Sequence, residues 1–261
     1  MLIRIQPHCK IQCCSQNQDI VWQANLLPGL FDPPAIFGHE GAGIVRAKGA
    51  RVHNKEIEVG DSVLLSFYFC RVCKRCTSGH PASCENGNRN FLGTREDGST
   101  IVRRKADNKI LKGQFFGQSS FARLSTVREA CVVKFVGQVE DMGVFAACGC
   151  GFQTGVGTII NILKPERHES LVIFGMGAVG LTAVMGAKSL RVDQIIAVDL
   201  VESRLEIAKR VGATHTVNPT DVADMSRLIK KLTGGGATFC IDCTGVPKVI
   251  EAAIESVAPL G

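Results

Sequence analysis

The second half of the chain alternates short apolar runs with helical patterns, and this alternation restricts the fold more than any other feature. The strand patterns cover residues 170–175, 194–200, 214–218 and 237–245, and the helical patterns cover 180–190, 203–212, a polar stretch through Lys231 and 247–257. Strands and helices in strict alternation are typical of a parallel, doubly wound sheet. The sequence therefore predicts an α/β fold class.

The first strand of this series ends in the sequence GMGAVG, which supplies Gly175, Gly177 and Gly180. Gly175 permits a tight turn, Gly177 lets the backbone approach a pyrophosphate, and Gly180 lets the next helix pack closely on the strand. The N-terminus of that helix would offer N–H groups and the positive end of its dipole to the phosphates. The pattern predicts a dinucleotide site, and the alternative is a glycine turn in an unrelated α/β domain.

An acidic residue at the end of the second strand refines the choice of dinucleotide. Asp199 lies nineteen positions after Gly180. A carboxylate at this place accepts hydrogen bonds from ribose hydroxyls and repels a 2′-phosphate. Leu200 follows, so no basic residue immediately offsets the charge. We therefore expect NAD as a cofactor, in preference to NADP.

The part of the chain before residue 153 has a different character. Short β-like runs at 61–67 and 130–136 are separated by turn residues and long polar stretches. This pattern is typical of a compact β-rich domain. We expect two domains, covering residues 1–152 and 153–261.

Four of the 12 cysteines lie within fifteen residues of the β-rich part, at Cys70, Cys73, Cys76 and Cys84. Thiolates spaced this closely can converge on a tetrahedral ion, and four sulfurs close its coordination shell. Such a site is structural because no position is left for a substrate. Zinc is the expected metal, an iron–sulfur cluster is the rival, and four reduced surface thiols are the remaining alternative.

Composition and charge exclude several classes of function. No apolar run is long enough to span a bilayer, and the start, MLIRIQPHCK, lacks the apolar core of a signal peptide. A cytoplasmic protein with reduced cysteines is therefore expected, without a membrane partner. The net charge of +6 is spread along the chain apart from residues 103–105. A solvated loop explains that basic triplet better than a nucleic-acid site, so no nucleic-acid partner is expected.

Two further glycine-rich stretches contain metal-binding residue types. GHEGAG at 38–43 contains His39 and Glu40, and CGCGFQTG at 148–155 contains Cys148 and Cys150. Alone, His39 is more often structural, and the two cysteines are more often small buried residues. Histidine and cysteine together, with one ligand still to be found, form the open shell that a catalytic zinc needs.

These motifs together resemble the zinc-dependent alcohol dehydrogenases of the medium-chain dehydrogenase/reductase superfamily. The resemblance rests on Gly38-His39-Glu40 with Gly43 and Gly49, on the cysteine lobe at 70–84, on GCGFQTG, and on GMGAVG followed by Asp199. FFGQSSFA at 115–122 looks like the aryl-alcohol, or benzyl alcohol, branch. The resemblance covers about residues 19–261. It implies a GroES-like catalytic domain, with the cysteine lobe as its structural zinc site, joined to a Rossmann domain.

The resemblance also implies roles for individual residues. His39 and Cys150 would be ligands of a catalytic zinc, Glu40 would lie next to that zinc, and Thr154 would face the cofactor. In such enzymes zinc acts as a Lewis acid on the alcohol, and the nicotinamide accepts a hydride. The implied function is oxidation of a primary, aromatic or hydrophobic alcohol by NAD. Its partners would be a small alcohol or aldehyde and other copies of the chain in a homo-oligomer.

The chain departs from the family pattern near its start. The family's first zinc ligand lies in a Cys–x–Ser/Thr–Asp motif, and alignment from Asp19 puts Gln16 and Gln18 in the cysteine and hydroxyl positions. Cys13 or Cys14 is the candidate for a shifted third ligand, and a divergent loop is the alternative. The resemblance also implies that strands are missing at both ends and that the Rossmann domain is truncated. A catalytically impaired NAD- and zinc-binding paralogue or partner subunit is therefore the alternative function.

The last alternative is a thiol redox protein that uses Cys240 and Cys243, which are separated by two residues. Reactive pairs with this spacing usually open a helix. Here the pair flanks Asp242 on a predicted core strand. The position therefore disfavours redox chemistry.

Overall fold

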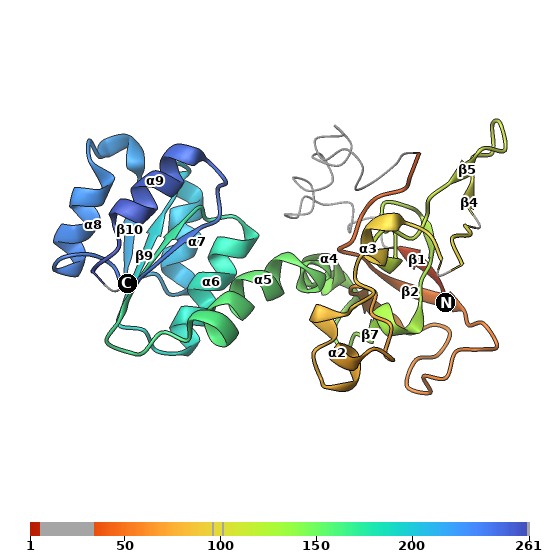
Figure 1. Cartoon of the computed structure of the whole chain (residues 1–261). Helices are drawn as coiled ribbons and strands as arrows, with labels where there is room; N and C mark the ends of the chain where they lie inside the picture. Colours follow the sequence, from red (N-terminus) through yellow and green to blue (C-terminus); the bar gives the residue numbers. More distant parts are fainter. Residues whose placement is uncertain (6–33, 96, 101, 260–261) are drawn as a thin grey trace. The chain divides into compact units, whose positions relative to one another are not determined.

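The structure is a computed structural model and describes residues 1–5, 34–95, 97–100 and 102–259 (Figure 1). The chain divides into two compact units, Met1–Cys150 and Gly151–Gly261. The domain boundary expected from the sequence, between residues 152 and 153, lies two positions further along the chain. Each unit is described by itself below.

The first unit is built on a five-stranded antiparallel sheet in the order β6-β1-β2-β3-β7. Its strands are β1 (Leu2–Ile5), β2 (Ala42–Ala47), β3 (Ser62–Leu65), β6 (Leu124–Thr126) and β7 (Val132–Lys134). The side chains of Ile3, Val45 and Val63 are fully buried and meet in one core. Alternating burial along short strands is typical of a sheet with one covered face. The predicted run at 130–136 forms a strand only at Val132–Lys134, because Glu129–Cys131 is a 3-10 turn.

Short elements fill the connections of the first unit. The helices are α2 (Lys74–Thr77), α3 (Arg89–Leu92) and α4 (Met142–Phe145), and a small hairpin consists of β4 (Val102–Arg103) and β5 (Ile110–Leu111). The 3-10 turns are η2 (Pro81–Ser83), η3 (Phe115–Gly117), η4 (Glu129–Cys131), η5 (Val139–Asp141) and η6 (Ala146–Gly149). Elements this short are not stable alone, so they depend on contacts with the rest of the folded unit.

The second unit is a four-stranded parallel sheet in the order β10-β9-β8-β11. Its strands are β8 (Ser170–Phe174), β9 (Gln194–Val198), β10 (His215–Val217) and β11 (Phe239–Asp242). Its helical elements are α5 (Gly151–Gly157), η7 (Thr158–Leu163), α6 (Ala178–Ser189), α7 (Glu202–Val211), η8 (Pro219–Asp221), α8 (Met225–Thr233) and α9 (Pro247–Glu255). Every residue of the central strand β8 is buried, as expected for a strand with helices on both faces. The predicted α/β fold class, with a β-rich first part and a parallel sheet that alternates with helices, is confirmed.

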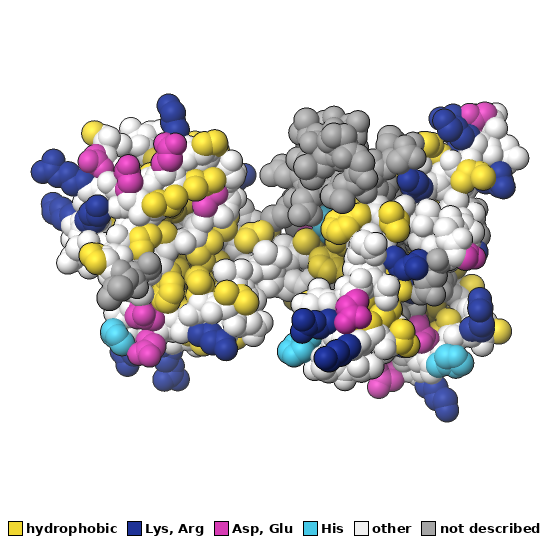
Figure 2. All heavy atoms as spheres, viewed as in Figure 1, with side chains coloured by type: hydrophobic (Ala, Val, Ile, Leu, Met, Phe, Trp, Pro, Cys, Tyr) yellow, Lys and Arg dark blue, Asp and Glu magenta, His cyan; other side chains and the backbone are white. Residues whose placement is uncertain are grey.

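Figure 2 shows how charged side chains are distributed on one face of the molecule. On the face shown in Figure 2, basic and acidic side chains are interspersed on both units. The basic triplet at 103–105 lies at the β4–β5 hairpin, where Arg104 is paired with Asp107. In the described part of the chain, no single helix is long and apolar enough to cross a membrane. One bent pair, Val139–Gly149 followed by Gly151–Leu163, passes that test by length and composition only.

Candidate metal and nucleotide sites

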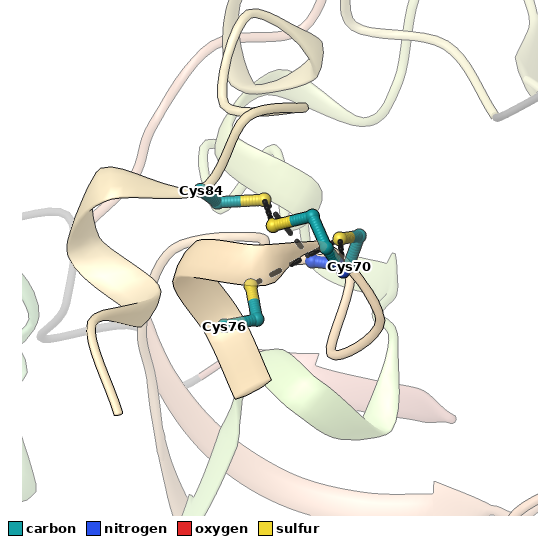
Figure 3. A group of neighbouring side chains, drawn as sticks. Cys70, Cys76 and Cys84 are labelled. Carbon is teal, nitrogen blue, oxygen red and sulfur yellow. Dashed lines mark hydrogen bonds between the residues drawn. The ribbon is translucent and has the colours of Figure 1, made fainter. Parts of the chain in front are cut away.

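The four clustered cysteines converge in the loop around α2 and η2 (Figure 3). All four sulfur atoms lie within 4.8 Å of one another. Cys70 Sγ is 3.9 Å from Cys76 Sγ, and Cys73 Sγ is 4.0 Å from Cys84 Sγ. Sulfurs bound about 2.3 Å from a tetrahedral zinc lie roughly 3.8 Å apart. The donor set and its spacing therefore fit a structural zinc.

The protonation of these thiols also favours a cation. Hydrogen bonds, first from the Asn86 side chain and then from backbone N–H groups, lower the pKa of Cys70 to about 6. Desolvation and the neighbouring sulfurs raise the pKa of Cys76 to about 12. Adjacent thiols cannot all ionise without a compensating charge, since like charges raise one another's pKa. A divalent ion would supply that charge and allow four thiolates.

Glu129 anchors the cysteine lobe to the rest of the unit, and sequence reasoning missed it. Its Oε1 lies 3.0 Å from Nη1 of Arg71, which sits inside the lobe. Its Oε2 accepts hydrogen bonds from the backbone N–H groups of His53 at 2.7 Å and Asn54 at 3.2 Å. No sequence pattern joins residues 53, 71 and 129, so only the fold identifies this contact.

His39 lies in a buried aromatic cluster just before β2. Its ring stacks on Phe116, with ring centroids 4.4 Å apart and an interplanar angle of 23°. The rings of Phe115 and Phe67 lie 5.8 Å and 6.2 Å from it. The side chain is fully buried, and Glu40 next to it is 6% exposed. An imidazole in such a dry apolar environment is well suited to hold a metal ion near a hydrophobic substrate.

The fold brings the loop that carries Cys150 against His39, although the two lie far apart in sequence. A Cβ on Gly149 would overlap the Leu65 carbonyl oxygen and would lie 3.7 Å from the His39 carbonyl oxygen, so only glycine fits. Desolvation, and after it the charge of Glu40, raises the pKa of Cys148. Imidazole and thiolate are donors that zinc prefers, so the described residues fit that metal in type.

The candidates for a third ligand of this proposed zinc lie outside the described residues. Cys13, Cys14, Gln16 and Gln18 all belong to the segment 6–33. Among the described residues, the four-cysteine lobe is the one group in which three or more possible ligand atoms meet. The set of His39, Cys150 and Cys13 or Cys14 therefore stays a prediction.

The glycine turn after β8 has the geometry that a pyrophosphate needs. Gly175 has φ +92°, a conformation that favours glycine, and a Cβ on Gly180 would overlap the Gly175 carbonyl oxygen. Apart from its neighbours in the chain, no described residue has an atom within 4 Å of a Cβ placed on Gly177, so the backbone there is accessible to a ligand. The helix α6 begins at the next residue, Ala178. These residues fit a dinucleotide phosphate at the helix N-terminus.

Asp199 lies directly beside this turn. Its Oδ2 accepts a hydrogen bond from the Met176 N–H at 2.6 Å, and its Oδ1 accepts one from the Val201 N–H at 2.8 Å. Arg204 Nη1 lies 3.8 Å from Asp199 Oδ2. The residue next to Asp199 in sequence, Leu200, carries no charge, and the compensating cation comes instead from Arg204. The first turn of α7 carries this arginine back to the carboxylate. Asp199 lies before the helix and five positions from Arg204, so the i,i+3 or i,i+4 spacing of helical ion pairs does not signal this contact.

Three other residues singled out from the sequence lie in the second unit. Thr154 is exposed on α5, and its role toward the cofactor stays a prediction. Cys240 packs into the hydrophobic cluster on one face of the sheet, and Cys243 packs into the cluster on the other face. Because the two thiols lie on opposite faces, the structure opposes a redox pair.

Comparisons with known proteins match both units. A family model described as "Alcohol dehydrogenase GroES-like domain" matches residues 8–137, and one described as "Zinc-binding dehydrogenase" matches residues 178–261. Geraniol dehydrogenase from Castellaniella defragrans is 39% identical over 230 residues, covering 87% of this chain and 60% of that protein. A probable alcohol dehydrogenase from Pseudomonas is 34% identical over 253 residues, covering 96% and 77%. This chain thus spans about 60% of the length of the first relative.

Solved structures of alcohol dehydrogenases are also similar to this chain. Benzyl alcohol dehydrogenase from Acinetobacter calcoaceticus superimposes with a TM-score of 0.82 at 37% identity, covering 100% of this chain and 67% of that one. An alcohol dehydrogenase zinc-binding domain protein from Burkholderia ambifaria gives 0.83 at 37% identity, covering 98% and 66%.

Proposed function

Because this chain belongs to the family of zinc-binding alcohol dehydrogenases with a GroES-like domain, we propose that it oxidises a primary alcohol with NAD. The family predicted from the sequence motifs is confirmed. The chain spans about 60% of the length of the geraniol dehydrogenase that it matches, so the activity, the cofactor and the substrate are our proposals. Hydrophobic alcohols, aromatic ones above all, are the proposed substrates.

The aromatic environment of His39 is the observation that carries this proposal. Phe116 stacks on the imidazole, and Phe115 and Phe67 line the same cluster. Apolar rings exclude water and favour an apolar substrate beside a metal ligand. Two similar proteins are named for geraniol and benzyl alcohol, which are both hydrophobic primary alcohols.

Each proposed site residue has a defined task. His39 and Cys150 would hold a zinc that acts as a Lewis acid on the substrate hydroxyl. The backbone at Gly177 and the start of α6 would bind the pyrophosphate, and Asp199 would orient the ribose. The described residues give no sign of the impaired paralogue considered as an alternative, since the two proposed zinc ligands and the nucleotide turn are all present.

The test is the formation of NADH by the purified chain. With zinc, NAD and benzyl alcohol, we expect turnover on the order of one per second or faster. Ethanol should be oxidised with a kcat/KM at least about tenfold lower, because each buried CH₂ contributes about 0.8 kcal/mol. Absence of NADH formation from protein that carries two zinc ions per chain would refute the proposed function.

We expect Asp199→Asn to weaken the preference for NAD over NADP by about tenfold or more, since the charge that repels the 2′-phosphate is removed. Asparagine keeps an oxygen that can accept the Met176 N–H hydrogen bond. Titrations of both cofactors monitored by protein fluorescence measure the ratio. The matched variant Arg204→Gln should shift the ratio in the opposite direction, because it removes the cation 3.8 Å from the carboxylate. A parent protein that binds NADP more tightly than NAD would contradict this expectation.

A further inference from the structure

Gln118 is a fully buried polar side chain whose hydrogen bonds all go to the backbone around His39. Its Nε2 donates to the His39 carbonyl at 2.8 Å and to the Ser66 carbonyl at 3.1 Å. Its Oε1 accepts from the Gly41 N–H at 3.1 Å. The side chain therefore uses both of its donor hydrogens and its acceptor, which is the full engagement expected of a buried amide.

These bonds hold three segments that lie far apart in sequence. His39 and Gly41 lie 79 and 77 positions from Gln118, and Ser66 lies 52 positions from it. Leu65 precedes Ser66, and its carbonyl oxygen lies against Gly149, the neighbour of Cys150. The Gln118 amide therefore links two parts of the proposed zinc site. One is the segment that carries His39. The other is the end of β3, which contacts the loop that carries Cys150.

The turn that carries Gln118 is itself held firmly in place. The backbone N–H of Ser120 donates to the Gly38 carbonyl at 2.9 Å, and Ser125 Oγ donates to the Gln118 carbonyl. Phe116 adopts φ 49°, which is unusual for a bulky residue, and this conformation accompanies its stacking on His39. Strain of this kind persists where the surrounding contacts over-determine the backbone, and it clusters at functional sites.

We propose that Gln118 is a positioning residue that sets the backbone of His39 relative to the loop of Cys150, so that both reach one metal ion. The proposal rests on the proposed function, since it assumes that these two residues hold zinc. A metal site tolerates only small displacements of its ligands, and buried hydrogen bonds that orient them are part of its affinity. An apolar side chain of the same length would fill the space without fixing the carbonyl of His39.

The test compares Gln118→Met with Gln114→Met on the full chain. Gln114 belongs to the same turn and is also buried, but its Nε2 donates to the Thr126 carbonyl at 2.8 Å, away from His39. Zinc affinity of the second site is measured by chelator competition, with the four-cysteine lobe as an internal standard that stays loaded. We expect a loss of about tenfold to a hundredfold in that affinity for Gln118→Met. The change for Gln114→Met should be less than about twofold.

A second measurement distinguishes a positioning role of Gln118 from a general effect on the stability of the fold. In the cobalt-loaded protein, Gln118→Met should shift the absorption bands of the second site, because the ligand geometry changes. Gln114→Met should lower the melting temperature to a similar extent and leave the bands in place. If Gln118→Met does not fold, the milder variant Gln118→Asn is tested by the same two measurements, zinc affinity and cobalt absorption. The shorter asparagine amide cannot reach all three hydrogen-bond partners.

The outcomes distinguish this inference from the function on which it rests. A parent chain that binds a single metal ion refutes the proposed function, and the positioning role falls with it. A parent chain with two metal ions, whose second site is unchanged in affinity and spectrum by the Gln118 variant, refutes the positioning role and leaves the proposed function intact.

Discussion

Replacing Cys76 with serine is expected to remove one zinc ion per chain and to lower the melting temperature of the first unit by roughly 10 °C or more. The sulfur of Cys76 lies 3.9 Å from that of Cys70, and all four cysteine sulfurs lie within 4.8 Å of one another. A serine hydroxyl is a much weaker zinc ligand than a thiolate, so one corner of the tetrahedron is lost.

The size of this effect follows from the construction of the lobe. The helix α2 has four residues and η2 has three, and neither buries a side chain. Without a core of its own, the lobe depends on the metal for its folding free energy. Metal analysis by mass spectrometry and thermal unfolding followed by circular dichroism are the measurements.

Cys240→Ser is the matched control for the cysteine lobe. Cys240 is a half-buried cysteine of β11 in the other unit, and no metal ligand cluster includes it among the described residues. It should leave the zinc content unchanged. The lobe would not be a metal site if Cys76→Ser kept its full zinc and melted like the parent.

Replacing His39 with glutamine is expected to reduce alcohol-dependent NADH formation by about a thousandfold or more. A Lewis acid on the substrate contributes several kcal/mol to the transition state, and about 4 kcal/mol corresponds to a thousandfold in rate. Glutamine keeps much of the volume beside Phe116, which limits the cavity that alanine would leave. The zinc of the cysteine lobe should stay bound while the second zinc is lost.

His168→Gln is the control for this substitution. His168 is exposed in the loop before β8, and its Nδ1 lies 3.6 Å from Oε2 of Glu166. Its rate should equal that of the parent within about twofold. Our assignment of His39 would be wrong if His39→Gln retained both zinc ions and a rate within a few-fold of the parent.

Features whose physical cause is local could be predicted from the order of the residues. The spacing of Cys70, Cys73, Cys76 and Cys84 predicted a four-sulfur site, because ligands so close along the chain can meet with little loop closure. The turn from Gly175 to Gly180 is equally local, since a tight turn and the close packing of a helix on its strand dictate the glycines. The alternation of strands and helices is also a local pattern along the chain, and it predicted the parallel sheet.

Contacts between residues far apart in sequence became visible only in the folded chain. It placed Gly149 against the carbonyl of His39 and brought Gln118 to the same backbone from a third segment. It also tied the cysteine lobe to Glu129. Such contacts have no local signature, because they arise when the sheet of the first unit closes and packs segments whose separation in sequence carries no pattern. A hydrogen bond between a buried amide and a backbone carbonyl can involve almost any pair of positions, so only the folded chain identifies the partners.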